Sequence, residues 1–214
     1  MMLSSVRLLQ LALPLVKNHG FTRDALARSV MALPLSEAHT EPLSETSVSA
    51  LFGSGDSSRR NLIKAWLDDG IRYMDTMPPG SSVNEVLRAR LEYNEPVLQF
   101  LPEAFALLAS PQSGLPPLDL RPALQHASTI ADKACRITGD KSLQLAWYTR
   151  RMSLATIYSV SELHQLTSPD TAYTFLETLL HSSVSFKSSL NEVDLFSSYI
   201  VKSWRGIINS YGIL

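Results

Sequence analysis

The stretch LAWYTRRMSLATIYSVSEL, residues 145–163, is typical of an α-helix, yet its apolar residues occupy two faces instead of one. With about 100° between successive residues, the first stripe is Leu145, Tyr148, Met152, Ala155 and Leu163, and the second is Trp147, Leu154 and Tyr158. Arg150 and Arg151 border the second stripe. A surface helix of a globular domain needs a single apolar stripe. Either this helix lies centrally in a bundle, or its second stripe contacts another molecule.

Helix-breaking residues on both sides of this stretch divide the chain into segments of helical periodicity, which predicts an all-α fold. Gly, Pro or a capping Asn, Asp or Ser separates successive segments of helical periodicity, and no β-type alternation lies between them. Asn94, for example, is expected to cap a helix that begins at Glu95 and Pro96. We predict a bundle of about ten helices. The expected segments are 3–18, 22–32, 45–52, 57–77, 81–93, 95–109, 118–138, 141–167, 169–188 and 190–211.

The first four of these segments predict a helix-turn-helix arrangement, because short helices follow one another around a small apolar cluster. Together with the larger helical part that follows, they resemble the fold of TetR-type regulators. We therefore expect a helix-turn-helix-like part over 1–77, a helical bundle over 78–188 and an amphipathic C-terminal helix over 189–214. The resemblance implies a homodimer that forms through the last bundle helices, about 141–188.

Charge argues against binding to DNA. The net charge is −1 over 214 residues, and no Lys or Arg lies between Arg28 and Arg59. The same span carries Glu37, Glu41 and Glu45, and a recognition helix needs cations that reach phosphates. We expect no nucleic-acid partner, and a TetR-like transcriptional regulator with a small-molecule pocket is the alternative function.

Signatures of catalysis and metal binding are missing from the sequence. It contains neither a phosphate-binding Gly-rich loop nor a G-x-S-x-G nucleophile motif. The five histidines lie in different segments without the spacing of metal ligands, and each is interpreted as a surface or capping residue. The single cysteine, Cys135, is interpreted as a small buried apolar residue. We expect no catalytic residue, no metal and no cofactor.

Membrane contact is one of three interpretations of the C-terminal segment. No run of 18 apolar residues could span a bilayer, and the apolar opening segment is interpreted as the first helix of the fold. The segment near the C-terminus carries an apolar helical stripe that would pack on its own bundle, on a dimer mate or in a membrane interface. Its residues include the candidate membrane-binding side chains Phe196, Ile200, Trp204, Ile207 and Tyr211.

Three strings resemble one protein family. They are RLEYNEPVLQFLPEAFALL (90–108), GDKSLQLAWYTRR (139–151) and LATIYSVSEL (154–163). The family is the mitochondrial lipid-binding accessory protein of ubiquinone biosynthesis, the ninth of the coenzyme Q proteins. Its pattern Gly-Asp-x-Ser ahead of Trp-Tyr-Thr-Arg-Arg is met at Gly139, Asp140, Ser142 and 147–151. Gln144 departs from the family, whose animal members carry Asp three residues before the Trp.

The resemblance implies a non-catalytic protein that binds an isoprenoid or phospholipid chain. It implies peripheral attachment to the matrix face of the mitochondrial inner membrane through the C-terminal amphipathic helix. The implied partners are the di-iron demethoxyubiquinone hydroxylase and the larger coenzyme Q biosynthetic complex. The implied partner-binding residues are Trp147, Tyr148, Arg150 and Arg151.

Helices 81–109 and 141–167 are expected to form the walls of the lipid pocket. Exposing a polyprenyl chain to water costs about 25 cal/mol per Å², so a protein that shelters the chain lowers the barrier to presenting it. The same apolar side chains could equally form an ordinary core. The candidate lining residues are Leu91, Leu98, Leu101, Phe105, Leu154, Ile157 and Tyr158.

Overall fold

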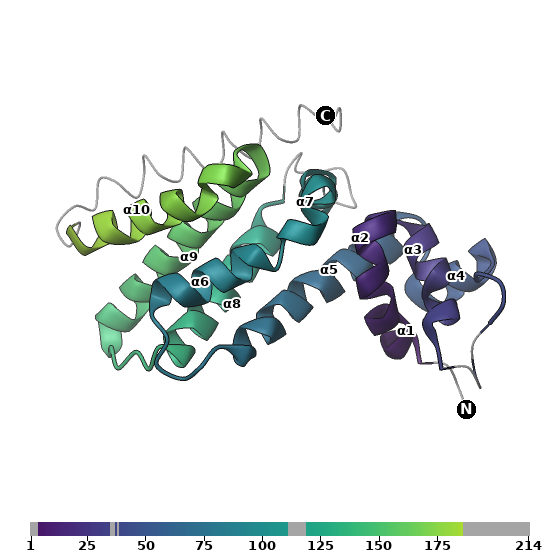
Figure 1. The fold of residues 1–214 in the computed structure, drawn as a ribbon, viewed down its shortest axis with the longest axis horizontal. Helices are drawn as coiled ribbons and strands as arrows, with labels where there is room; N and C mark the ends of the chain where they lie inside the picture. The colour runs from purple at the N-terminus through teal and green to yellow at the C-terminus, as the bar shows by residue number, and fades with distance from the viewer. Residues whose placement is uncertain (1–3, 35–36, 38, 111–118, 186–214) are drawn as a thin grey trace. The chain divides into compact units, whose positions relative to one another are not determined.

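The fold is all-α, as the sequence predicts. The computed structural model describes residues 4–34, 37, 39–110 and 119–185, and these residues contain no β-strand (Figure 1). The chain divides into two compact units, Met1–Asp69 and Gly70–Leu214. The first contains α1 (Ser5–Ala12), α2 (Val16–His19), α3 (Arg23–Arg28), α4 (Glu45–Phe52) and most of α5 (Asp56–Tyr73). The second contains α6 (Val83–Glu92), α7 (Leu101–Ala109), α8 (Arg121–Ile137), α9 (Gln144–Thr167) and α10 (Ala172–Ser185).

The helix boundaries follow the capping residues of the sequence. Thr22 and Ser44 accept hydrogen bonds from the N–H groups of Ala25 and Ser47 at the starts of α3 and α4. Ser82 forms a capping box with Glu85 at the start of α6. The expected segments up to residue 185 therefore appear within a few residues of their predicted ends, while the segment 190–211 lies outside the described residues.

Proline subdivides some of the expected helices into short 3₁₀ and α pieces. The first expected helix contains the 3₁₀ turn η1 (Leu13–Leu15), with Pro14 inside it. The expected helix 95–109 is the 3₁₀ segment η4 (Glu95–Phe100) followed by α7, and Pro102 lies in the first turn of α7. A proline removes one backbone donor and crowds the preceding turn, so the hydrogen-bond pattern changes there.

Arg23 joins the elements of the first unit. Its guanidinium lies 2.7 Å from the Glu45 carboxylate and donates to the Ser49 and Ser58 hydroxyls at 2.8 and 2.9 Å. Arg59 donates to the Phe21 carbonyl at 2.9 Å, which fixes α5 to the loop before α3. These two arginines connect α3, α4 and α5 within this unit.

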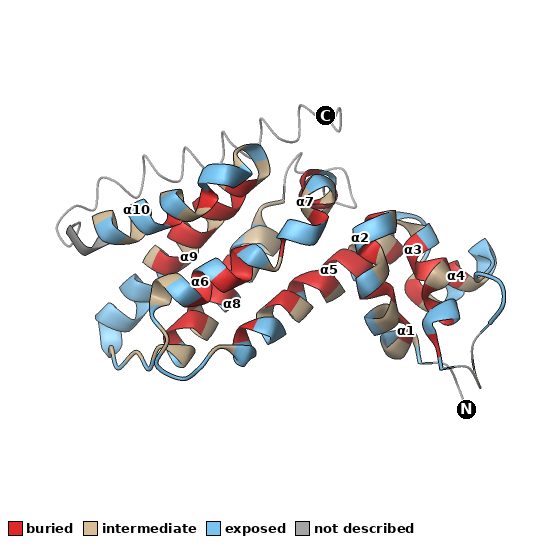
Figure 2. Ribbon diagram, in the orientation of Figure 1, coloured by how far each residue is buried: buried red, intermediate tan, exposed pale blue. Residues whose placement is uncertain are grey.

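The second unit packs four helices around an apolar cluster (Figures 1 and 2). The side chains come from α6, α8, α9 and α10, and the 3₁₀ segment η3 (Met74–Thr76) closes one end with Met74. Cys135 lies in this cluster, as expected for a small apolar residue, and burial raises the pKa of its thiol. The buried members are Met74, Val86, Leu87, Leu91, Ile130, Ala131, Ala134, Cys135, Leu154, Ile157, Tyr158 and Leu176.

A buried polar network crosses this core from α6 to α9. Arg90 donates to Asn94 Oδ1 at 2.7 Å, and Asn94 Nδ2 donates to Glu162 Oε1 at 3.0 Å. The Tyr158 hydroxyl donates to the same carboxylate oxygen at 2.7 Å. Asn94 occupies the expected N-cap position, before the 3₁₀ segment η4 (Glu95–Phe100), but its side chain makes no capping hydrogen bond and links a buried cation to a buried anion instead. A buried charge is tolerated only when it is paired or hydrogen-bonded in this way.

The space for the Arg90 side chain depends on Gly70. A Cβ atom on Gly70 would lie 2.8 Å from Arg90 Cζ and 2.9 Å from both Arg90 Nε and Tyr93 Cδ1. Because the guanidinium is fixed by Asn94 and stays fully buried, it has little freedom to yield. Gly70 is therefore needed for contact between α5 and the polar network.

We predict that Gly70→Ala destabilises the protein by about 1–2 kcal/mol. Overpacking a core costs about 1–3 kcal/mol, whereas the better helix propensity of Ala regains at most about 1 kcal/mol. Urea unfolding followed by circular dichroism measures the change. Asp68→Ala, at an exposed position of the same helix, is the control and should change the stability by less than about 0.5 kcal/mol. A Gly70→Ala protein at least as stable as the wild type would contradict the contact.

Candidate functional site

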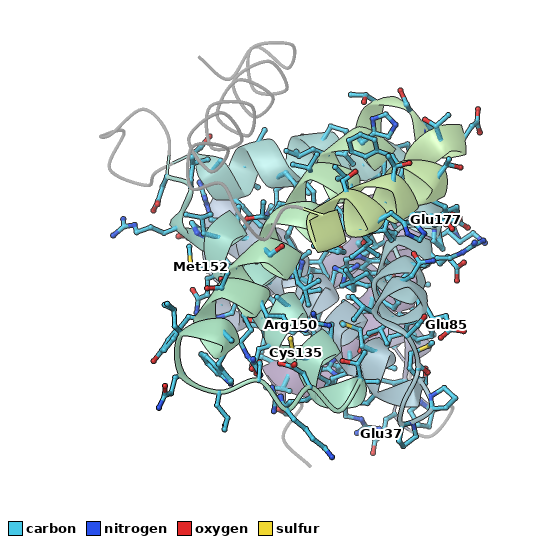
Figure 3. The ribbon with its side chains drawn as sticks, turned by 90° about the vertical axis from the view of Figure 1, so that its left-hand side faces the viewer. Glu37, Glu85, Cys135, Arg150, Met152 and Glu177 are labelled. Atoms are coloured by element: carbon cyan, nitrogen blue, oxygen red, sulfur yellow. The ribbon has the colours of Figure 1, made fainter. Side chains whose placement is uncertain are left out.

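The start of α9 projects from the bundle with apolar side chains in solvent. Every residue from Leu143 to Arg150 is exposed, and Leu145 exposes 79% of its surface. In Figure 2 the first turns of α9 are pale blue, whereas its later part is red. Figure 3 shows Met152 on the outer side of the same helix. We call the exposed apolar group Leu143, Leu145, Trp147, Tyr148 and Met152 the α9 ridge.

Burial along α9 follows the position in the helix and not the two stripes, because the first turns are exposed and the later turns are buried. Leu154 and Tyr158 of the second stripe are buried in the apolar cluster, whereas Trp147 of the same stripe is 37% exposed. Leu145, Tyr148 and Met152 of the first stripe are exposed, whereas Leu163 is buried. Each stripe therefore contacts the core with its later residues and leaves its first residues in solvent. Leu145 and Met152, and with them Leu143, were missed as surface residues, since periodicity identifies a stripe without showing which turns of the helix lie outside the core.

Two aromatic rings and one guanidinium pack together on the ridge. The Trp147 and Tyr148 rings meet edge-on with centroids 4.8 Å apart. Arg151 Cζ lies 3.9 Å from the centroid of the Trp147 ring, which is 37% exposed. This is the geometry of a cation–π contact, and it fixes one face of the indole against the protein.

The two arginines of the block differ in their surroundings. Arg151 is ion-paired within the protein, to Asp132 at 3.0 Å and to Asp140 at 3.3 Å, and its side chain is only 14% exposed. Arg150 is half-exposed and lies 3.4 Å from Asp140. Two carboxylates of this chain therefore already hold the charge of Arg151, whereas the charge of Arg150 stays partly in solvent.

The Gly-Asp-x-Ser pattern shapes the loop between α8 and α9. Gly139 has φ +67°, a left-handed conformation that ends α8 and lets the Asp140 N–H reach the Cys135 carbonyl at 2.9 Å. The Ser142 hydroxyl donates to Asp140 at 2.6 Å. This hydrogen bond, together with the charges of Arg150 and Arg151, lowers the pKa of Asp140. The pattern thus keeps an ionised carboxylate beside Arg151.

Gln144 begins α9 in a strained conformation. Its φ of +53° is the one positive value found at a non-glycine residue in the described part of the chain. Left-handed backbone costs a residue with a Cβ about 1–2 kcal/mol. The strained residue therefore lies where the loop turns into the ridge.

The candidate lipid-lining residues are brought only partly together. Leu91, Leu154, Ile157 and Tyr158 lie in the apolar cluster, and Leu101 and Phe105 are buried on α7. Leu98 instead lines an open surface pocket of about 450 Å³. The other residues of this pocket are Glu95, Pro96, Gln99, Pro102 and Leu166.

The described residues bear on membrane and metal contacts as follows. The candidate membrane-binding residues Phe196, Ile200, Trp204, Ile207 and Tyr211 lie outside the described residues. Within the described residues, no helix has the length and apolarity that crossing a bilayer requires. The same residues hold no group of three or more potential metal ligands.

His126 is neither a surface histidine nor a cap, in contrast to the expectation for all five. It is partly buried on α8, its ring meets Tyr158 edge-on at 6.5 Å, and Nε2 lies 3.3 Å from Arg90 Nη2. Burial, and then the positive charge of Arg90, lower the pKa of His126 well below its usual value. The neutral ring accepts from Arg90, so His126 extends the buried network to α8.

Comparisons with known proteins confirm the resemblance seen in the sequence. The sequence model of the COQ9 family matches residues 120–187. "Ubiquinone biosynthesis protein coq9, mitochondrial" of Schizosaccharomyces pombe is 29% identical over 96% of this chain and 80% of its own length. The Drosophila melanogaster protein of the same name is 36% identical over 51% of the chain and 33% of its own length. The Bos taurus protein is 24% identical over 94% of the chain, which spans 63% of that relative.

We predict that mild acid destabilises the folded protein through His126. The unfolded imidazole takes up a proton as the pH falls below about 6.5, whereas the folded one resists because its pKa is lowered. Stability is therefore lost from about pH 6.5 downward. Urea unfolding of the wild type and His126→Gln between pH 7.5 and 5 measures this, because glutamine can accept from Arg90 without titrating. Parallel pH profiles of the two proteins would contradict a lowered pKa at His126.

Proposed function

From the resemblance of nearly the whole chain to COQ9 proteins, we propose that it takes part in mitochondrial ubiquinone biosynthesis. Its role is that of a non-catalytic protein that binds an isoprenoid quinone precursor and presents it to the demethoxyubiquinone hydroxylase. The observation that carries this proposal is the α9 ridge, an exposed apolar surface within the block that resembles the family. A TetR-like regulator is less well supported, since Arg23 and Arg59 are engaged within their own unit.

The α9 ridge has the composition of a protein interface. Tyr and Trp are enriched among the residues that dominate binding energy, and apolar contacts around them exclude water. Leu145 and Tyr148 provide exposed apolar area, and Arg150 provides a half-exposed charge at its side. Clustered apolar residues on a folded surface mark an interaction site more often than single ones do. The hydroxylase is the partner we assign to this surface.

The lipid-binding part of the proposal rests on the apolar cluster below the ridge. This cluster contains Leu91 of α6, Leu154 and Ile157 of α9 and Leu176 of α10. Helices α6, α9 and α10 would have to move apart for a polyprenyl chain to enter between them. The chain would replace apolar contacts with apolar contacts, so little transfer free energy opposes the exchange. Residues 189–214 would hold the protein on the matrix face of the inner membrane while this occurs.

We predict that Leu145→Lys weakens binding to the demethoxyubiquinone hydroxylase at least tenfold. A charge at this exposed position of the ridge would have to be buried against apolar groups of the partner. Biolayer interferometry with the purified hydroxylase measures the affinity. Leu124→Lys is the matched control, because Leu124 is also an exposed leucine, at 56%, but near the start of α8. Equal affinities for the wild type and Leu145→Lys would remove the ridge as the hydroxylase-binding surface.

We also predict that the purified chain carries bound lipid. Organic extraction followed by mass spectrometry should detect an isoprenoid or a phospholipid in near-stoichiometric amount. Ile157→Phe should reduce that amount, because the larger ring fills space between the helices that the lipid would occupy. The melting temperature of Ile157→Phe shows whether it is folded. Protein that is free of lipid, and that takes up no ubiquinone precursor from vesicles, would contradict lipid binding.

A further inference from the structure

The exposed first turns of α9 need an anchor to hold the ridge in place. Residues 144–150 are all exposed, and Arg151 is the first residue of the helix that is not. Within them, Arg150 lies 3.4 Å from Asp140 and Trp147 packs against Arg151, and two helical turns with so few contacts are not stable by themselves in water. The Gln144 backbone is strained as well, which weakens the start of the helix further. The orientation of Trp147 and Tyr148 therefore depends on contacts made at the level of Arg151.

We propose that Asp132, Asp140 and Arg151 form a clamp that orients Trp147, and that Arg151 is a positioning residue and does not touch the partner. This inference rests on the proposed function, since it assigns how the ridge is prepared for the hydroxylase. The guanidinium lies between two carboxylates, at 3.0 and 3.3 Å, and the Trp147 ring, at 3.9 Å. Its Nη1 also donates to the Trp147 carbonyl at 3.4 Å.

The two carboxylates are themselves fixed, which makes the clamp rigid. Asp132 on α8 also pairs with Arg136, one helical turn further on, at 2.8 Å. Asp140 is held by the Ser142 hydroxyl and by its own N–H on the Cys135 carbonyl. Contacts therefore run without a gap from α8 through Arg151 to the indole. Because charge-assisted bonds to a planar guanidinium are directional, they fix the plane on which the indole stacks.

The clamp and a direct role for Arg151 predict opposite effects when the carboxylates are neutralised. If Arg151 contacted the hydroxylase, Asp132→Asn with Asp140→Asn would free the guanidinium and leave affinity unchanged or higher. If Arg151 orients Trp147, the same double variant loosens the ridge and lowers affinity. Substitution by amides keeps the shape of both side chains, and an amide oxygen at position 140 can still accept from Ser142.

The test measures the affinity of full-length variants for the demethoxyubiquinone hydroxylase. The double carboxamide variant should bind about fivefold to tenfold more weakly than the wild type. Asp119→Asn is the matched control, because it removes the exposed Asp119–Arg121 ion pair, at 2.9 Å, elsewhere on the protein. Unchanged or tighter binding of the double variant would overturn the clamp. Circular dichroism establishes that the variants are folded.

A double-mutant cycle supplies a measurement that does not depend on the carboxylates. Arg151→Lys keeps the charge but lacks the planar group, so it should weaken binding in the wild type. It should have no further effect in the Trp147→Ala background, because the ring that it positions is gone. Equal losses in both backgrounds would assign Arg151 to the interface itself and overturn the clamp.

The same experiments separate the clamp from the proposed function. If Trp147→Ala and Leu145→Lys both leave the affinity unchanged, the ridge does not bind the hydroxylase and the proposed function fails. If both weaken binding while the carboxamide variant does not, the ridge is the interface and only the clamp is wrong. Labelling with 5-fluorotryptophan gives a fluorine resonance for Trp147, which is assigned by its loss in Trp147→Phe. The clamp predicts that this resonance shifts in the double carboxamide variant, whether or not the hydroxylase is present.

Discussion

The need to compensate a buried arginine constrains much of the second unit. Arg90 is fully buried, and its charge is acceptable only because Asn94 and His126 accept from it and Glu162 balances it through Asn94. This requirement fixes α6 against α8 and α9 in one register. It also requires glycine at position 70, where a Cβ would meet the guanidinium. Apolar residues of this core could exchange with others of similar size, whereas the polar members depend on one another.

Much of the fold could be predicted from the sequence, because its local signals agree with one another. Ser82 with Glu85, Thr22 and Gly139 end or begin helices where capping rules place them. The role of Asn94 could not be predicted in this way. An Asn before Glu-Pro satisfies the rule for an N-cap, and only the tertiary fold brings Glu162, 68 residues away, within reach of its amide. The partner of a buried polar group is a long-range property that local patterns do not contain.

The candidate site could be located but not oriented from the sequence. Two apolar stripes on α9 indicate that some of its apolar residues lie outside the core, and the first turns of the helix are exposed. Periodicity gives the angle between the stripes but not the point along the helix at which it leaves the core, so Leu145 and Met152 were missed as surface residues. The roles of Asp132 and Asp140 were hidden for a related reason. An isolated Asp in a sequence is most simply solvated, and the Gly-Asp-x-Ser pattern alone does not show that its carboxylate faces Arg151.

The exposed ridge has a consequence for how strongly the free protein associates with itself as its concentration rises. An apolar strip on one helix can pair with the same strip of a second molecule about a two-fold axis, which would remove the leucines from water. Such pairing would use the very surface that we assign to the hydroxylase. The two associations would then exclude each other, and two hydroxylase molecules would be needed to convert one symmetric dimer into two mixed complexes. In that case the ridge of the isolated protein would be covered by a second copy until the hydroxylase displaces it.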